Sequence, residues 1–255
     1  MYPLPETKLT RVTIITATYN SASTVKDTLA SIDAQEYPHI EHLVVDGCSK
    51  DETLSIVNTF GHVAQLVCEP DNGIYDAMNK GIKIATGDII GILNSDDFYA
   101  DANVISDVVN HFETTGCDAL YADLLYVDAE KTNKVVRKWK SGEYKRDNFL
   151  IGWMPPHPTF FVKKEVYEKF GLFDTRLRSA ADYELLLRFM YINKIATSYL
   201  PRVLVHMRSG GMSNRSFKNR IKAHLEDYRA WSFNGIRPKW YTVVLKPIRK
   251  VFQYL

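Results

Sequence analysis

The sequence predicts an α/β protein in which a mostly parallel central sheet is flanked by helices. Short runs of β-branched and apolar residues alternate with segments whose apolar side chains recur at helical spacing. This alternation is typical of a parallel sheet with helices on both faces. The 255 residues are enough for one α/β domain with a small extension. Apolar residues form 45% of the chain and charged residues 24%, as in globular proteins and unlike disordered ones.

Four strands are expected in the first hundred residues. Each is a short apolar run that ends at a polar group, as buried strands of a parallel sheet do. The expected strands are 12–18, 42–46, 63–68 and 88–93. The connecting segments carry apolar side chains along one face and are expected to be helices. These helices are 22–35, 50–60 and 74–85.

The pattern is looser after residue 100. Further strands are expected at 117–127, 134–140, 159–162 and 196–206. Further helices are expected at 101–115, 180–194, 215–232 and 239–253. The Gly- and Ser-rich segment 208–214 ends the expected main domain, 1–214, and the helices beyond it form an extension, 215–255.

The charge distribution excludes some classes of protein. The net charge is only +2, which is not that of a globally basic nucleic-acid binder. Residues 201–255 nevertheless hold twelve Lys and Arg against two acids, so an anionic partner or a solvated basic helix pair is expected there. The three cysteines, an odd number without CxxC spacing, argue against a disulfide framework or a zinc cluster. With no apolar run of about 18 residues and no secretory signal at the start, a cytoplasmic location is expected.

Polar side chains follow each of the first four expected strands. They lie in the segments 18–20, 46–47, 69–71 and 94–97. A single such end is ordinary turn chemistry, but ligands of parallel α/β sheets bind beyond the carboxyl ends of the strands. The sequence therefore predicts a polar pocket at this edge. It contains no GxGxxG after the first strand, no P-loop and no GxSxG elbow, which argues against three common α/β enzyme classes.

Two acidic positions at this edge suggest specific chemistry. Asp96 and Asp97 are adjacent carboxylates after an apolar strand, and they repel each other unless a cation such as Mg²⁺ or Mn²⁺ neutralises them. The alternative is an acidic cap on the helix that follows. Asp46 ends a strand ahead of the residues that cap the next helix, so its carboxylate is expected to be free to accept a hydrogen bond from a nucleobase.

Four motifs together resemble the family 2 glycosyltransferases. They are TATYN at 16–20, VVDGCSKDET at 44–53, EPDNGIYDAMNKG at 69–81 and GDIIGILNSDD at 87–97. Their order and spacing most resemble the bacterial enzymes that build colanic acid, capsule and O-antigen, over about residues 10–215. The resemblance implies a glycosyltransferase A fold and an inverting transfer from a nucleotide sugar.

The resemblance also implies roles for individual residues. Asp97 would bind the Mn²⁺ or Mg²⁺ that bridges the donor phosphates, with a late histidine, His206, as a second ligand. An ordinary strand-end histidine is the alternative for His206. Many relatives carry Arg in place of Met78, which leaves open whether Lys80 supplies a phosphate contact. The implied donor-binding residues are Thr18, Tyr19, Asn20, Asp46, Asn72, Gly73, Asn79, Lys80, Ser95 and Asp96.

Catalysis is expected from the second half of the chain. Asp182 is the expected general base and Glu184 the second choice, although both acids could instead complement a helix dipole. His157, in a Pro-rich loop, is expected on the acceptor side, with a structural loop histidine as the alternative.

The resemblance implies a hexosyl- or N-acetylhexosaminyltransferase of bacterial surface polysaccharide synthesis. The expected donor is a UDP-sugar, the acceptor a glycan or a polyprenyl-diphosphate-linked sugar, and no nucleic acid takes part. The basic helices of 215–255 are expected either to contact the anionic inner membrane surface or to pack on the body. A non-catalytic nucleotide-sugar or glycan-binding module is one alternative. A nucleotidyltransferase is another, although the Gly-rich loop with a lysine typical of that class is absent.

Overall fold

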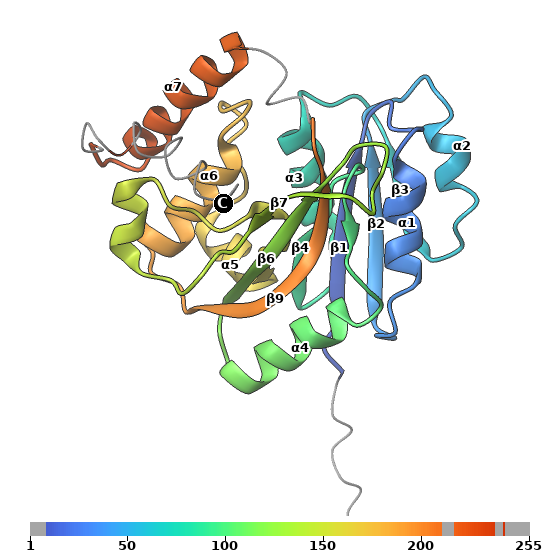
Figure 1. Ribbon diagram of the computed structural model, residues 1–255, viewed down its shortest axis with the longest axis horizontal. Helices are drawn as coiled ribbons and strands as arrows, with labels where there is room; N and C mark the ends of the chain where they lie inside the picture. The colour runs from blue at the N-terminus through green and yellow to red at the C-terminus, as the bar shows by residue number, and fades with distance from the viewer. Residues whose placement is uncertain (1–8, 211–216, 238–241, 243–255) are drawn as a thin grey trace, which may run out of the picture.

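The computed structural model describes residues 9–210, 217–237 and 242 (Figure 1). Within these residues, nine strands form one curled, mostly parallel sheet in the order β3-β2-β1-β4-β8-β6-β9-β5, with β7 paired to β6. The first four strands in the chain are parallel to one another. They are β1 (Val12–Thr18), β2 (Ile40–Asp46), β3 (Val63–Cys68) and β4 (Ile89–Ile92). Their carboxyl ends therefore meet at one edge of the sheet.

The second half of the sheet mixes directions. It consists of β5 (Phe98–Tyr99), β6 (Ala119–Val127), β7 (Val135–Trp139), β8 (Phe161–Lys163) and β9 (Thr197–Arg208). The short strand β8 is antiparallel to both β4 and β6, whereas β6 and β9 are parallel to each other. This strand therefore joins the parallel half to the rest of the sheet.

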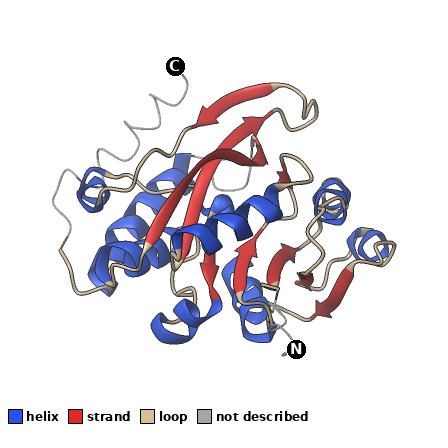
Figure 2. Ribbon diagram, turned by 90° about the horizontal axis from the view of Figure 1, so that it is seen from below, coloured by secondary structure: helices blue, strands red, loops and turns tan. Residues whose placement is uncertain are grey.

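Helices cover both faces of the sheet (Figure 2). They are α1 (Val25–Asp33), α2 (Thr53–Val57), α3 (Ile74–Ile84), α4 (Val104–Thr115), α5 (Lys164–Phe170), α6 (Ala181–Leu186) and α7 (Phe217–Phe233). The π-helix η3 (Leu187–Ile192) continues α6, and the 3₁₀ turns are η1 (Arg146–Ile151) and η2 (His157–Thr159). No helix in the described ranges is long and apolar enough to cross a membrane.

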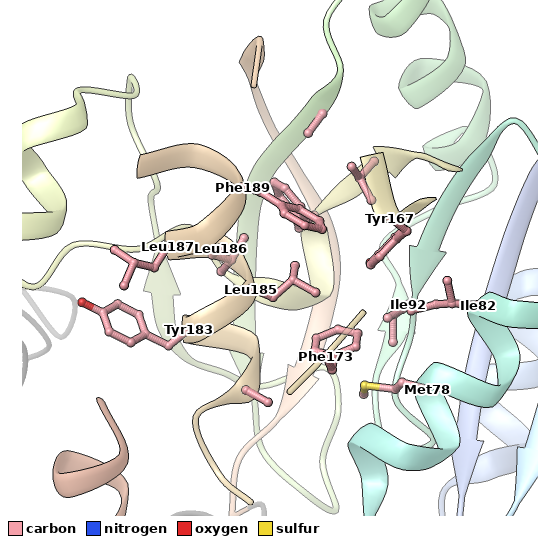
Figure 3. Packing of buried hydrophobic residues seen from close by; sticks show 14 of the residues in the cluster. Met78, Ile82, Ile92, Tyr167, Phe173, Tyr183, Leu185, Leu186, Leu187 and Phe189 are labelled. Carbon is pink, nitrogen blue, oxygen red and sulfur yellow. The ribbon is translucent and has the colours of Figure 1, made fainter. Parts of the chain in front are cut away.

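The side chains of β1 explain why both faces need helices. Ile14 packs with α4 on one face, and Ile15 packs with α3 on the other. Successive residues of a strand point to opposite faces, so a strand buried on both sides must be apolar throughout. Figure 3 shows the second of these cores, where α6 with Leu185 lies across from α3 with Met78 and Ile82.

Two glycines set the spacing of these layers. A β-carbon at Gly81 of α3 would lie 2.5 Å from the Cγ2 atom of Ile15 in β1. A β-carbon at Gly91 of β4 would lie 2.4 Å from the ring of Phe161 in β8. Real β-carbons do not approach so closely, so α3 sits on β1, and Phe161 covers β4, only because these residues have no side chain.

The expected strands of the first hundred residues are confirmed within about three residues at their ends, the usual margin for element boundaries. The first two helices are shorter than expected, because local turns take up their first residues. Ser21 accepts backbone hydrogen bonds from Thr24 and Val25 at 3.0 and 2.9 Å, and the carboxylate of Asp51 accepts one from the Thr53 N–H at 3.0 Å. The expected helix 239–253 lies almost entirely outside the described residues.

Candidate functional site

Tyr19, Gly47 and Asp71, which follow β1, β2 and β3, lie close together beyond the carboxyl ends of these strands. A β-carbon at Gly47 would lie 2.4 Å from the Oδ2 atom of Asp71 and 3.3 Å from the ring of Tyr19. The Tyr19 side chain keeps 60% of its surface exposed. An exposed aromatic face beside a carboxylate suits a planar, hydrogen-bonding group such as a nucleobase. Tyr19 is one of the expected donor-binding residues, and Asp71 belongs to the polar segment 69–71 but was not proposed as a site residue.

Asp46 ends β2 directly before Gly47. Its buried carboxylate accepts hydrogen bonds from the Thr18 hydroxyl at 2.7 Å and from the Ser49 N–H and hydroxyl at 2.7 and 2.6 Å. The expectation that this carboxylate is free for a ligand is therefore wrong. Thr18 is buried too, and the pair holds the end of β1 against the loop after β2.

Asn20 and Ser95 lie at the same edge of the sheet, after β1 and β4. Asn20 has a φ of 49°, an uncommon conformation that asparagine tolerates, and its side chain accepts a hydrogen bond from the Lys50 N–H at 2.9 Å. The hydroxyl of Ser95 lies 2.8 Å from that of Ser21. Both residues are at least partly exposed, so each has surface available to a ligand.

The loop before α3 presents Asn72 and Gly73 to solvent. Gly73 has a φ of 115°, which favours glycine, and its N–H donates to the Asp71 carboxylate at 2.8 Å. Lys80 lies beneath this loop, where its ammonium group donates to the Pro70 carbonyl at 2.6 Å and pairs with Glu69 at 3.0 Å. Lys80 thus holds the loop in place, and the structure does not present it as a free phosphate contact.

Asn79 makes a structural contact rather than the expected donor contact. Its amide group is buried, donating to the Phe173 carbonyl and accepting from the Phe173 N–H, both at 2.9 Å. Both ends of the side chain are therefore occupied by a residue 94 positions away. The expectation that Asn79 binds the donor directly is wrong in this arrangement.

Asp96 and Asp97 follow β4 at the same edge. Asp97 is fully buried, and its Oδ2 atom accepts a hydrogen bond from the Asn94 amide at 3.2 Å, while no residue of the described ranges bonds to its Oδ1 atom. Burial, and then the neighbouring charge of Asp96, raise the pKa of Asp97 well above its usual value. Burial also raises the pKa of Asp96, although Arg208 opposes this. A cation would relieve both effects.

The pair fits a divalent ion whose other ligands are phosphate oxygens. Mg²⁺ and Mn²⁺ sites of this kind use one or two carboxylates from the protein. The orphaned Oδ1 atom of Asp97 is a suitable oxygen ligand. Among the residues that the structure describes, no three His, Cys, Asp or Glu side chains gather as a complete metal site.

His206 does not join Asp97. It pairs with Phe98 across β5 and β9, its ring lies edge-on to that of Phe98 at 5.2 Å, and the nearby charge on it is that of Asp101. His206 was expected as a metal ligand, with an ordinary strand-end histidine as the alternative, and these contacts fit the alternative. The cation beside the acidic pair is instead Arg208, which donates to the Asp96 carbonyl at 2.8 Å and pairs with Asp27.

Asp182 lies at the start of α6, partly exposed. Its Oδ1 atom accepts a hydrogen bond from the Tyr75 hydroxyl at 3.1 Å. Tyr75 belongs to the first turn of α3, directly after the loop with Asn72 and Gly73. Asp182 and this loop are therefore connected through a single side chain.

Glu184 has a different environment from Asp182. It is buried, and both carboxylate oxygens accept from Arg188, at 2.8 and 2.9 Å. Arg188 also donates to the Leu172 carbonyl at 2.6 Å. This buried ion pair ties α6 to the segment before it, so the geometry does not support Glu184 as a proton acceptor for substrate.

His157 lies near Asp182. Its ring is edge-on to Phe173 at 5.9 Å, and its buried Nε2 atom has no hydrogen-bond partner in the described part of the chain. Burial lowers the pKa of His157, although the charge of Asp182 opposes this. The imidazole is therefore neutral near pH 7 and adjoins the candidate base.

Comparison with known proteins identifies similar sequences among the glycosyltransferases. Residues 13–171 match the family model described as Glycosyl transferase family 2. A PGL/p-HBAD biosynthesis glycosyltransferase of Mycobacterium bovis is 30% identical over 207 residues, covering 79% of this chain and 78% of that protein. An uncharacterized glycosyltransferase of Mycobacterium tuberculosis is 31% identical over 180 residues, covering 69% and 68%. The relatives that match most of this chain are thus glycosyltransferases.

Solved structures show the fold. S. aureus TarS 1-349 in complex with UDP-GlcNAc has a TM-score of 0.68 at 19% identity, over 88% of this chain and 65% of that one. The chain therefore spans about two thirds of the TarS fragment. The mannosyltransferase PcManGT of Pyrobaculum calidifontis, in complex with GDP-Man and Mn²⁺, has a TM-score of 0.67 at 21% identity, over 97% and 70%. The expected glycosyltransferase A fold is confirmed.

Proposed function

Because the chain belongs to glycosyltransferase family 2, we propose that it is an inverting enzyme that transfers a hexose or N-acetylhexosamine from a UDP-sugar. The proposed acceptor is a glycan or a polyprenyl-diphosphate-linked sugar of bacterial surface polysaccharide synthesis. The observation that carries this proposal is the hydrogen bond between Tyr75 and Asp182. It connects a candidate base to the helix that starts at the candidate donor loop.

The donor would lie across the carboxyl ends of the first four strands. Tyr19 offers an exposed ring for the base, and Asn72 and Gly73 offer an exposed loop for the nucleotide sugar. Asn20, Ser95 and Asp96 border the same edge. The similar TarS and PcManGT structures were obtained with UDP-GlcNAc and with GDP-Man, which supports a nucleotide sugar as the class of donor.

Asp96 and Asp97 would hold a Mn²⁺ or Mg²⁺ ion together with the donor phosphates. Their raised pKa values and the orphaned oxygen of Asp97 support this role, as does the Mn²⁺ bound by PcManGT. When bound, the ion would offset the negative charge that develops on the departing nucleoside diphosphate.

Asp182 would act as the general base. As the acceptor oxygen forms its bond to the anomeric carbon, the bond from that carbon to the diphosphate breaks, and Asp182 takes the proton of the acceptor hydroxyl. A single displacement of this kind inverts the anomeric centre. His157, neutral and beside Asp182, would border the acceptor.

The proposed setting is the cytoplasm, at the inner face of the membrane. The basic residues of 215–255 would meet an anionic surface there. Cosedimentation with liposomes that contain anionic lipid tests this, and equal binding after deletion of residues 236–255 would contradict it. We also propose that the chain consists of a main domain, 1–214, and this extension.

A donor screen tests the function. The chain is incubated with UDP-, GDP- and dTDP-sugars, with and without Mn²⁺, and the release of nucleoside diphosphate is measured. We expect release from UDP-sugars that depends on Mn²⁺. A preference for GDP- or dTDP-sugars would contradict the proposed base. Binding without turnover would favour a non-catalytic module, and consumption of nucleoside triphosphates would favour a nucleotidyltransferase.

Two variants test the assigned residues. Asp182→Asn should retain donor binding and lose about 10²- to 10⁴-fold in turnover, the usual contribution of a general base. Asp97→Asn should lose the stimulation by Mn²⁺. Asp33→Asn, at a side chain that is 58% exposed on α1, is the control and should behave as wild type. Wild-type turnover by both test variants would contradict the assignments.

A further inference from the structure

Among the described residues, the Asp182 carboxylate accepts one side-chain hydrogen bond, from Tyr75. The two residues are 107 positions apart and belong to α6 and α3, on either side of a shared core. A carboxylate at the second position of a short helix can adopt several rotamers unless another group fixes it. The Tyr75 hydroxyl is the group in position to do so.

Tyr75 is itself held rigidly. Its ring stacks on that of Phe173, with centroids 5.4 Å apart and planes 26° from parallel. The backbone of Phe173 is fixed in turn by its two hydrogen bonds with Asn79, one donated and one accepted by the Asn79 amide. Tyr75 and Asn79 are four residues apart on α3, so they share one face of this helix. Figure 3 shows Phe173 between α3, which carries Met78, and α6, which carries Leu185.

Further titratable groups surround this contact. The His157 ring, from η2, lies edge-on to that of Phe173, and the charge of Asp182 acts to raise the pKa of His157. Glu226 from α7 acts on Tyr75 from the other side. Burial, followed by the charge of Asp182, raises the pKa of Tyr75 well above its usual value, so its hydroxyl keeps the proton that it donates.

We propose that Tyr75 is a positioning residue for Asp182, holding one carboxylate oxygen so that the other is directed at the acceptor hydroxyl. This inference rests on the proposed function of Asp182 as the base. Because Tyr75 lies one turn from Asn72 and Gly73, the same side chain fixes the base relative to the donor loop. Asn79 and Phe173 support it from beneath. The motif residues of α3 thus act on the base as well as on the donor.

The chemistry gives a distinct expectation for the pH profile. A hydrogen bond to a carboxylate favours its charged form. Tyr75→Phe removes that bond and keeps the stacked ring, so the acid limb of the kcat profile should move up by about one pH unit. The kcat at neutral pH should fall about 10-fold, because the base is less well oriented. The KM for the donor should change little, since no donor contact is lost.

The measurement is the steady-state rate of hydrolysis of UDP-GlcNAc or GDP-mannose, whichever the wild-type chain turns over faster. The rate is measured from about pH 5 to about pH 9, a range that brackets neutral pH. Tyr199→Phe is the matched control, since the Tyr199 hydroxyl also donates to an aspartate, Asp123, at 2.8 Å. It should leave the acid limb in place. Phe173→Leu, which removes the ring beneath Tyr75 but keeps the hydroxyl, should move the limb in the same direction by less.

The outcomes separate this inference from the proposed function. Loss of turnover in Asp182→Asn together with the shifted limb in Tyr75→Phe supports both. Loss of turnover in Asp182→Asn with an unshifted limb in a folded Tyr75→Phe overturns the positioning role alone. Wild-type turnover in Asp182→Asn overturns the base itself. Thermal unfolding of each variant establishes that it is folded, and if Tyr75→Phe is not, an unshifted limb in Phe173→Leu overturns the positioning role.

Discussion

Asp182 and Glu184 are two acids on the same short helix with opposite surroundings. Asp182 is partly exposed and accepts one hydrogen bond from Tyr75, whereas Glu184 is buried and bonded through both oxygens to Arg188. A catalytic carboxylate needs an oxygen available to substrate, and a buried ion pair offers none. The two residues therefore differ in what their loss would affect.

Glu184→Ala should lower the free energy of unfolding by about 3 kcal/mol, because it leaves the Arg188 charge unpaired inside the protein. Urea denaturation measures this. Asp182→Asn, the comparison on the same helix, should change the midpoint little. If Glu184→Ala were as stable as wild type and yet had lost turnover, the roles of the two acids would have to be exchanged.

His42 makes stability depend on pH. Burial, and then the charge of His62, lower the pKa of this imidazole from 6.5 to about 3. The folded protein therefore keeps His42 neutral while the unfolded chain takes up a proton below pH 6.5. The stability that this group contributes is present above that pH and is lost as the pH falls toward about 3.

His42→Gln should flatten this dependence, whose slope is at most about 1.4 kcal/mol per pH unit for one proton. The free energy of unfolding is compared at several values below pH 6.5. Some slope should remain, since burial also lowers the pKa of His62. An unchanged slope in the variant would show that His42 is not the responsible group.

At the level of elements, α3 joins the two halves of the site. Its start follows the donor loop, its first turn carries Tyr75, and its middle carries Asn79, which holds Phe173. Gly81 lets the same helix lie directly on β1. One helix thus connects the parallel sheet to the segment before α6.

Asn79→Ala should lower the free energy of unfolding by about 1–3 kcal/mol for each buried polar group that loses its hydrogen-bond partner. These groups are the N–H and the carbonyl of Phe173. Denaturation with and without UDP-GlcNAc measures the effect. Asn72→Ala, at an exposed position seven residues earlier in the chain, should leave stability close to wild type. Equal stability of the two variants would mean that the contact to Phe173 contributes nothing.

The motifs explain why the first half of the site was predictable. Strands β1 to β4 are apolar runs that end at polar residues, and local patterns of this kind can be seen in the sequence alone. The corrections concern Asp46 and Asn79, while the sequence left alternatives open for Lys80, Glu184 and His206. The side chain of each of these residues contacts another part of the chain, as Asn79 contacts Phe173. The hydrophobic periodicity of the sequence contains no information on such contacts. The two-residue strand β5, which decides where His206 points, is too short to give a pattern.

At the level of the whole molecule, α7 packs against α6 (Figure 1). Trp231 is fully buried, and its indole N–H donates to the Tyr183 hydroxyl at 2.9 Å. Glu226 accepts from the Ser179 N–H at 2.7 Å. Residues 226–231 therefore belong to the same core as α6, although the sequence suggested an extension starting at 215.

Trp231→Ala should destabilise the protein by about 3–5 kcal/mol through the cavity that it leaves. The unfolding of wild type should also be one transition, with fluorescence and circular dichroism changing together. Phe233→Ala, at a side chain that is 42% exposed on the same helix, is the milder comparison. Two separate transitions in wild type would instead support an independent extension.

The contact between Gly91 and Phe161 restricts how this chain and its relatives can diverge. A methyl group at position 91 has no space beside a phenylalanine at 161, so an alanine there should occur together with a smaller residue at 161. The same compensation should be visible in the laboratory. Gly91→Ala alone should be poorly tolerated, and adding Phe161→Leu should restore part of the lost stability, as a thermodynamic double-mutant cycle would reveal.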